Sequence, residues 1–189
     1  MQTQSTIASQ IAHIKNNGVI AAFNQVASET GLDRNLLLAI ASRESGMGKK
    51  LDANWLGDNG NGIGLMQIDR RYHKDFAASY APNNHLANIR YSAEFLQSNL
   101  RKFPGNLHAA IAAYNTGADS VNEALRLKLD PDLYTTGQDY SKDVESRYHL
   151  INKHFGYGKD TDFQKNVAVA LLAGAAVILY GTLNFSKGK

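Results

Sequence analysis

Residues 57–69 read GDNGNGIGLMQID, a glycine-rich stretch between segments whose apolar residues recur at helical spacing. An aspartate lies near each end, Asp58 and Asp69. Glycine tolerates positive φ and close backbone approach, so the stretch predicts a loop or short hairpin of the kind that forms the floor of a groove. The alternative is a plain turn, in which Asp and Asn side chains bond their own backbone. Any strands in this chain are expected here, and they would be short.

The segments before this loop predict helices. Residues 17–29 and 34–45 both show apolar positions at helical spacing. Gly31 suits the end of the first helix, and Asp33 suits the N-cap of the second. Glu44 then falls in the last turn of the second helix, directly after the apolar run LLLAIASR.

The segments after the loop continue the helical pattern, and no repeat of 20 to 50 residues interrupts it. We therefore expect a mainly α domain over residues 1–158, followed by a linker at 159–165. The expected helices here are 84–102, ended by Pro104-Gly105, an alanine-rich buried one within 106–117, ended by Gly117, a shorter one around 119–128, and 140–155.

Residues 166–186 read NVAVALLAGAAVILYGTLNFS and carry no charge. About 20 apolar residues can span a membrane as a helix, and the lysines that follow would anchor such a helix at the cytoplasmic side. The alternative is an apolar helix packed on the domain. The N-terminal sequence lacks a Sec-type signal, so a route for the main domain across a membrane is not evident.

Composition excludes several classes of protein. The chain has 189 residues, a formal net charge of +3 and no cysteine. Disulfides, thiolate metal sites and cysteine nucleophiles are therefore excluded. No cluster of Lys and Arg is interleaved with aromatic residues, so nucleic acid is not an expected partner. Histidines 85, 108, 149 and 154 show no metal-ligand spacing, and we expect neither a metal nor a cofactor.

The carboxylates suggest acid–base chemistry. Burial and the negative end of a helix dipole would both raise the pKa of Glu44, as suits a general acid near neutral pH. Asp58 and Asp69 would share its groove, with the Gln67 amide free for a sugar hydroxyl. The alternative for Glu44 is a surface glutamate paired with a basic side chain. Residues 58–69 also match the length of an EF-hand loop, but glycines at its third and fifth positions leave too few calcium ligands.

Four blocks together resemble the goose-type lysozymes and the related soluble lytic transglycosylases. They are SRESG, GDNGNGIGLMQIDRRYH, AIAAYNTGADSV and DYSKDVESR, in family order over about residues 20–157. The resemblance implies a lysozyme-like helical domain that cleaves the β-1,4 bond between N-acetylmuramic acid and N-acetylglucosamine in peptidoglycan. Chitin oligomers are a side substrate to consider, because both polymers contain N-acetylglucosamine.

The resemblance also implies roles for individual residues. Glu44 matches the catalytic glutamate, and Asp58 and Asp69 match the aspartates that position or activate water. The lack of cysteines and the apolar tail depart from the vertebrate pattern, which suggests a bacterial or phage protein acting on the cell wall. Sugar contacts would fall on Gln67, His73, Tyr114, Asn115 and Tyr140, although Tyr114, His73 and Tyr140 each also suit a purely structural place.

Three functions stay open at this point. The first is an inverting hydrolase, in which the two carboxyl groups would stand about 6.5–9.5 Å apart to admit a water. The second is a lytic transglycosylase, in which Glu44 acts as acid and then base and the product carries a 1,6-anhydro ring. The third is a glycan-binding module without turnover, against which the complete carboxylate set argues.

Overall fold

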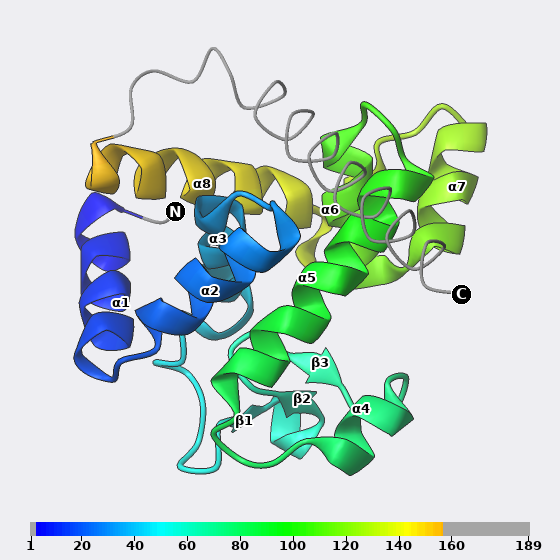
Figure 1. Cartoon of the computed structure of the whole chain (residues 1–189). Coiled ribbons are helices and arrows are strands. Elements are labelled where there is room, and N and C mark those ends of the chain that lie inside the picture. The colour runs from blue at the N-terminus through cyan, green and yellow to red at the C-terminus, as the bar shows by residue number, and fades with distance from the viewer. Residues whose placement is uncertain (1–2, 157–189) are drawn as a thin grey trace, which may run out of the picture.

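The computed structural model describes residues 3–156, which fold into eight α-helices, three 3₁₀ turns and one small sheet (Figure 1). The helices are α1 (Gln4–Asn16), α2 (Ile20–Thr30), α3 (Arg34–Ser45), α4 (Lys74–Ser79), α5 (His85–Lys102), α6 (Leu107–Thr116), α7 (Ala118–Arg126) and α8 (Tyr140–Phe155). The strands are β1 (Leu56–Gly57), β2 (Gly62–Ile63) and β3 (Ile68–Asp69), and the 3₁₀ turns are η1 (Asp58–Gly60), η2 (Pro131–Tyr134) and η3 (Thr136–Gln138).

Helix α3 lies at the centre of the hydrophobic core. Its side chains from Leu36 to Ala41 are fully buried, which is why the sequence there is apolar on every face. Asp33 caps the start by accepting the Asn35 N–H at 2.7 Å, and Gly46 ends the helix at a φ of +60°. Glu44 therefore lies in the last turn of α3, at the edge of the core and beside a defined helix end.

Helix α8 packs along α3 and is tied to it by polar contacts as well as apolar ones. The Arg147 side chain is buried and donates to the Ser42 carbonyl at 3.0 Å and to the Ser42 hydroxyl at 2.8 Å. Its charge is matched by Asp143 at 2.6 Å. Because a buried ion pair is stable only when its other hydrogen-bonding positions are filled, this arrangement fixes how the two helices pack.

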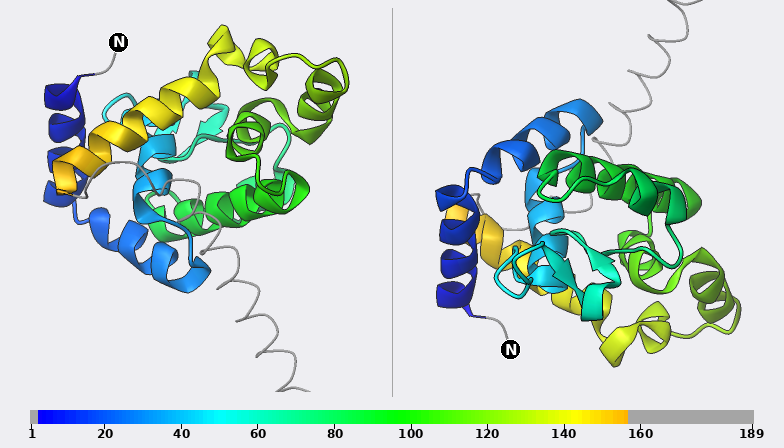
Figure 2. Two further views of the ribbon diagram at one scale, coloured as in Figure 1. Left: turned by 90° about the horizontal axis from the view of Figure 1, so that it is seen from above. Right: turned by 90° about the horizontal axis from the view of Figure 1, so that it is seen from below.

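The three strands form an antiparallel sheet in the order β1-β2-β3. The sheet lies with α4 at one end of the molecule in Figure 1, and Figure 2 shows it in the foreground when the molecule is seen from below. Its register places Gly57 opposite Gly62 and Gly62 opposite Asp69. The glycine-rich stretch therefore forms short paired strands, and Asp69 ends the last of them.

The turn between β2 and β3 is held by three helices. The buried Asn88 side chain of α5 accepts the Met66 N–H at 3.0 Å, and the Tyr114 hydroxyl of α6 donates to the Met66 carbonyl at 2.9 Å. The Ser45 hydroxyl of α3 donates to the Leu65 carbonyl at 2.7 Å. These bonds satisfy backbone groups that the short strands leave unpaired, and they fix the chain just before Asp69.

Most of the expected elements are confirmed. The helices predicted at 17–29, 34–45, 84–102, 106–117, 119–128 and 140–155 correspond to α2, α3, α5, α6, α7 and α8, and short strands lie in the glycine-rich region. Two helices were not predicted, α1 and the six-residue α4. Within residues 3–156 no helix has the length and apolar character of a membrane span. The linker predicted at 159–165 and the apolar helix at 166–186 lie outside the described residues, as do residues 157 and 158.

Candidate active site

A groove of about 950 Å³ runs between the sheet and helices α3, α5, α6 and α8. It is lined from both sides, since Glu44 comes from α3 and Asp69 from the end of β3. All of the side chains predicted as site residues line this single groove: Glu44, Asp58, Gln67, Asp69, His73, Tyr114, Asn115 and Tyr140. The structure thus brings together residues from four separate parts of the sequence.

Glu44 is partly buried in the last turn of α3. Burial raises the pKa of its carboxyl from 4.5 to about 7. A hydrogen bond from the Tyr140 hydroxyl and the positive charges of Arg43, Lys50 and Arg147 act in the opposite direction, lowering the pKa, but burial outweighs them. A carboxyl with this pKa is still substantially protonated at neutral pH and can donate a proton.

The phenol that contacts Glu44 belongs to Tyr140, the first residue of α8. Its side chain is almost fully buried, and burial raises the pKa of the phenol well above its ordinary value. Tyr140 therefore keeps its proton and acts as a hydrogen-bond donor to the carboxyl. Tyr140 was predicted to contact a sugar, and its hydroxyl proton is already used in the bond to Glu44.

Asp58 and Asp69 both contact Arg71, a residue that was not among the predicted site residues. The Arg71 guanidinium bonds both oxygens of Asp69, with its Nε 2.9 Å from Oδ1 and its Nη2 2.5 Å from Oδ2. The same Nη2 lies 3.3 Å from Oδ2 of Asp58. Arg71 holds the pKa of Asp69 below its ordinary value, so this carboxylate stays ionised at the pH where Glu44 is protonated.

Gln67 lies across the paired glycines of β1 and β2. A Cβ on Gly57 would come within 2.2 Å of its Oε1, and a Cβ on Gly62 within 2.1 Å. Its Nε2 donates to the Gly64 carbonyl at 2.8 Å. The glycines are therefore needed to make room for Gln67, and one donor of the predicted sugar-binding amide is already used within the loop.

His73 and Asn115 also take part in bonds within the protein. Nδ1 of His73 lies 2.8 Å from the Tyr91 hydroxyl, and burial lowers the pKa of the His73 ring. The Asn115 Oδ1 accepts the Thr136 N–H at 2.8 Å, which ties the end of α6 to η3. These contacts fix the two side chains in the groove wall and leave their other polar atoms for a ligand.

Several residues lining the groove were not predicted. Arg71 and the 82% exposed Tyr72 follow Asp69 directly, so the RRY within QIDRRYH was the available signal. Arg43 lies beside Glu44 and binds Asp139 at 2.8 Å and Asp143 at 2.9 Å. Gly62 and Ile68 belong to the glycine-rich stretch that was expected to form the groove floor, and the remaining members were not singled out: Phe95, Thr116, Gly117 and Thr136.

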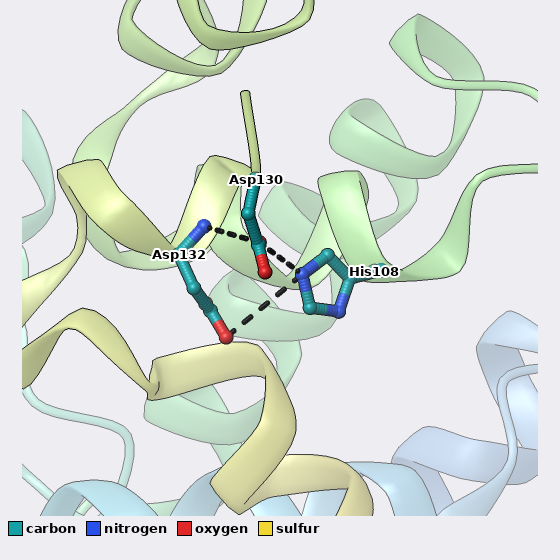
Figure 3. A group of neighbouring side chains, drawn as sticks. All are labelled: His108, Asp130 and Asp132. Atoms are coloured by element: carbon teal, nitrogen blue, oxygen red, sulfur yellow. Dashed lines mark hydrogen bonds and ion pairs between the residues drawn. The ribbon is translucent and has the colours of Figure 1, made fainter. Parts of the chain in front are cut away.

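A second cluster of ionisable side chains lies outside the residues that line the groove (Figure 3). His108 comes from α6, and Asp130 and Asp132 come from the start of η2. One donor atom from each lies within 4.8 Å of the others, so the group has the composition of a metal site, which the histidine spacing did not predict. The neighbours of these side chains decide the role of the cluster.

A partly buried glutamate whose pKa is raised shares one groove with Asp58 and Asp69, in a helical domain with a small sheet, and this combination defines a lysozyme-like glycosidase. The sequence profile of the Lysozyme g family matches residues 8–154. Over 142 residues the chain is 34% identical to Lysozyme g of Struthio camelus, covering 72% of this chain and 67% of that protein. It is 38% identical over 128 residues to Lysozyme g of Gallus gallus, covering 65% of this chain and 57% of that one. The chain belongs to the lysozyme g family, the goose-type lysozymes.

A solved structure supports the same fold. An inactive mutant of the lytic transglycosylase Slt from Pseudomonas aeruginosa superposes with a TM-score of 0.57 at 22% identity. The match covers 74% of this chain and 24% of that protein. The likeness is one of fold.

Proposed function

We propose that this protein hydrolyses the β-1,4 bond between N-acetylmuramic acid and N-acetylglucosamine in peptidoglycan. The observation that carries the proposal is that one groove holds a carboxyl group with a raised pKa and another with a lowered pKa. The pKa of Glu44 is raised to about 7, whereas the pKa of Asp69 is lowered. Two carboxyl groups whose environments separate their pKa values in this way suit an acid and an anion acting on the same bond.

In the first step Glu44 donates its proton to the glycosidic oxygen as the bond from this oxygen to the anomeric carbon breaks. The electron pair of that bond stays on the oxygen of the leaving sugar, and the other ring develops oxocarbenium character. The Tyr140 hydroxyl then stabilises the Glu44 carboxylate that remains, because it already donates to Oε1. Solvent restores the proton after the products leave.

In the second step a water held by Asp58 and Asp69 attacks the anomeric carbon from the opposite face. A new bond forms between the water oxygen and that carbon, and the water's proton passes to an aspartate and on to solvent. The product is a reducing end with inverted configuration. The Arg71 contacts to both aspartates support this role, because one guanidinium holds the two side chains side by side in the groove.

The groove wall supports a polymeric sugar as substrate. Gln67, His73, Tyr114 and Asn115 present amide, imidazole and phenol groups along it, and these are groups that bind sugar hydroxyls and acetamides. Tyr72 adds an aromatic ring that is 82% exposed at the same groove. A chitin oligomer offers the same acetamido sugars, so we expect it to be a weaker substrate.

The test is mass spectrometry of the fragments released from purified peptidoglycan by the wild type, Glu44→Gln and Asp58→Asn. We expect reducing ends from the wild type, a loss of product in Glu44→Gln and a strong loss in Asp58→Asn. Glu94→Gln on the exposed face of α5 is the matched control and should behave as the wild type.

Two other outcomes would overturn the proposal. Anhydro ends from both the wild type and Asp58→Asn would mean a lytic transglycosylase, in which the sugar's own hydroxyl attacks and the aspartates handle no water. Binding of glycan strands without any released product would mean a glycan-binding module.

A further inference from the structure

The first turn of α8 is capped from outside the helix. Its N-cap residue, Asp139, makes no side-chain capping bond and instead pairs with Arg43. Asp132 of η2 takes over this role, with Oδ1 accepting the Ser141 N–H at 2.8 Å and Oδ2 accepting the Lys142 N–H at 3.1 Å. Both donors are first-turn N–H groups that no helix carbonyl can satisfy.

Asp132 is suited to hold the backbone in place because its side chain is only 1% exposed. The adjacent backbone adds to this, since the Asp132 carbonyl accepts from the Thr135 hydroxyl at 2.8 Å. The same hydroxyl oxygen lies 3.3 Å from the Tyr140 N–H. The Asp132 side chain therefore binds the start of α8 directly, and its carbonyl is linked to Tyr140 through the Thr135 hydroxyl.

His108 provides the positive charge that a buried carboxylate needs (Figure 3). Its Nε2 lies 2.9 Å from Asp130 and 3.8 Å from Asp132, and its Nδ1 lies 3.3 Å from Glu145 of α8. With carboxylates on both ring nitrogens, the imidazolium form is favoured, and these contacts raise the pKa of His108 to about 9. Lys142 adds a further positive charge, 2.6 Å from Asp130.

The same contacts argue against reading this group as a metal site. Both oxygens of Asp132 already accept backbone N–H groups, and the Lys142 ammonium occupies one oxygen of Asp130. A cation binding there would have to displace these donors and deprotonate His108. The geometry instead describes a charge cluster that joins α6, η2 and the start of α8.

We propose that Asp132 is a positioning residue, which fixes the first turn of α8 and so directs the Tyr140 hydroxyl onto Glu44. His108 acts through it as the balancing charge. The inference rests on the general-acid role proposed for Glu44 and deepens it, because Tyr140 opens α8 immediately before the two N–H groups that Asp132 binds. Asp132 itself lies outside the residues that line the groove and touches no substrate.

The test is an NMR titration in which the ¹³C chemical shift of the Glu44 carboxyl is measured against pH. The signal is assigned by its absence in the Glu44→Gln variant. The Tyr140 hydrogen bond lowers the pKa of Glu44, so misplacing the hydroxyl should raise it. In Asp132→Asn an amide N–H₂ replaces one acceptor and the charge is lost. We expect the pKa of Glu44 to rise by about 0.5 to 1, which is the size of shift that losing one hydrogen bond would cause.

Other charged and titratable groups also face Glu44, and the substitution alters none of them. They are Arg43 of α3, Lys50, Tyr114 of α6 and Arg147 of α8.

Kinetics supply a second readout on peptidoglycan. At a pH well below 7, where Glu44 is protonated in both proteins, the kcat of Asp132→Asn should fall by about threefold to tenfold with KM nearly unchanged, because the Glu44 carboxylate formed in the first step loses a hydrogen bond while the sugar contacts are unaltered. Tyr140→Phe should raise the pKa of Glu44 by a similar amount. The double variant Asp132→Asn/Tyr140→Phe should show no further rise, since both changes remove the same hydrogen bond.

Thr3→Ala is the matched structural control. Thr3 caps α1 by accepting the Thr6 N–H at 3.2 Å, and α1 contributes no residue to the groove. Its Tm should fall while the pKa of Glu44 stays at the wild-type value. Should Asp132→Asn lack native circular dichroism, His108→Gln takes its place, since it removes the balancing charge and keeps the carboxylate; its shift should be smaller and in the same direction.

An unchanged pKa of Glu44 in folded Asp132→Asn, or in His108→Gln where that variant is used, would overturn the inference. Additive shifts in the double variant would also overturn it. So would a rise in the Tm of the wild type with Zn²⁺ that is lost in His108→Gln, because the cluster would then be a metal site. The titration needs no turnover, so a wild type that releases nothing from peptidoglycan would contradict the proposed function and leave the positioning role to be decided by the titration alone.

Discussion

The Tyr140 hydroxyl donates to Oε1 of Glu44, although the two residues lie 96 positions apart in the chain. The bond joins the first residue of α8 to the last turn of α3, so it depends on the packing of these two helices. Burial raises the pKa of Glu44, and this hydrogen bond partly opposes it. The balance leaves a carboxyl that gains and loses its proton near neutral pH.

Glu44→Gln should reduce the rate of peptidoglycan cleavage by about 10³-fold, within the range that positioned general acids contribute. Glutamine keeps the shape of the side chain and can still meet the Tyr140 hydroxyl, so binding of glycan strands should be nearly unchanged. Release of reducing ends measures the first effect and co-sedimentation with cell walls the second. Activity within tenfold of the wild type would contradict the assignment of Glu44.

The wild-type rate should fall as pH rises through about 7. A general acid works only when it is protonated, and the pKa of Glu44 is about 7, so the basic side of the pH–rate profile should report this group. The kcat/KM of the free enzyme on a soluble peptidoglycan fragment is the quantity to measure. A rate that stays constant up to pH 9 would mean that another group is the proton donor.

Glu44→Gln should also change the pH dependence of stability. The folded-state pKa of Glu44 is raised above 4.5, so its contribution to stability is fully present below about pH 4.5 and is lost as pH rises through about 7. Above that pH the wild type buries a charge that glutamine lacks. The variant should therefore be more stable than the wild type at pH 8, by up to about 3 kcal/mol, and about equally stable at pH 4. Urea unfolding at the two pH values measures the difference, and an equal effect at both would contradict the raised pKa.

The helices that the sequence predicted were those with strong local signals. Asp33 and Gly31 marked the boundary between α2 and α3, and both have the capping geometry expected of them. Helix α1 was missed because its buried stripe is narrow: Ile7, Ile11 and Ile14 are its only buried apolar residues, and the fourth buried side chain is the polar Gln10. Helix α4 has only six residues, too few for a periodic pattern.

The groove residues divide in the same way, into those with a local signal in the sequence and those without one. Glu44, Asp58 and Asp69 were identified as candidates because carboxylates beside an apolar helix end and a glycine-rich loop suggest chemistry. The role of Arg71 was not predicted, since its contacts to two aspartates depend on the register of the sheet. The capping of α8 by Asp132 links elements with no shared local pattern and is visible only in three dimensions.

Gly62→Ala should lower activity far more than it lowers stability. The new Cβ would lie 2.1 Å from the Gln67 Oε1, so the amide must leave its place across the sheet. We expect a loss of about tenfold or more in kcat/KM. The destabilisation should be only about 1 kcal/mol, because the displaced Gln67 side chain is partly exposed.

The control is the same change in a Gln67→Ala background, where no amide remains to be displaced. There Gly62→Ala should cost little further activity, since the two substitutions act on one contact. Initial rates of peptidoglycan cleavage for the four proteins complete the cycle. A full additional loss in the double variant would show that Gly62 matters for a reason other than Gln67.

Arg71→Met should move the acidic side of the pH–rate profile to higher pH. The Arg71 hydrogen bonds are the main reason that the pKa of Asp69 is lowered, so without them the carboxylate takes up a proton at a higher pH. If an ionised aspartate holds the attacking water, activity should then be lost earlier as the medium is acidified. Arg70→Met is the matched control, because Arg70 is the neighbouring exposed arginine and does not line the groove. An acidic side that is unchanged in Arg71→Met would mean that Asp69 does not need its charge, and the water-holding role would then have to rest on Asp58.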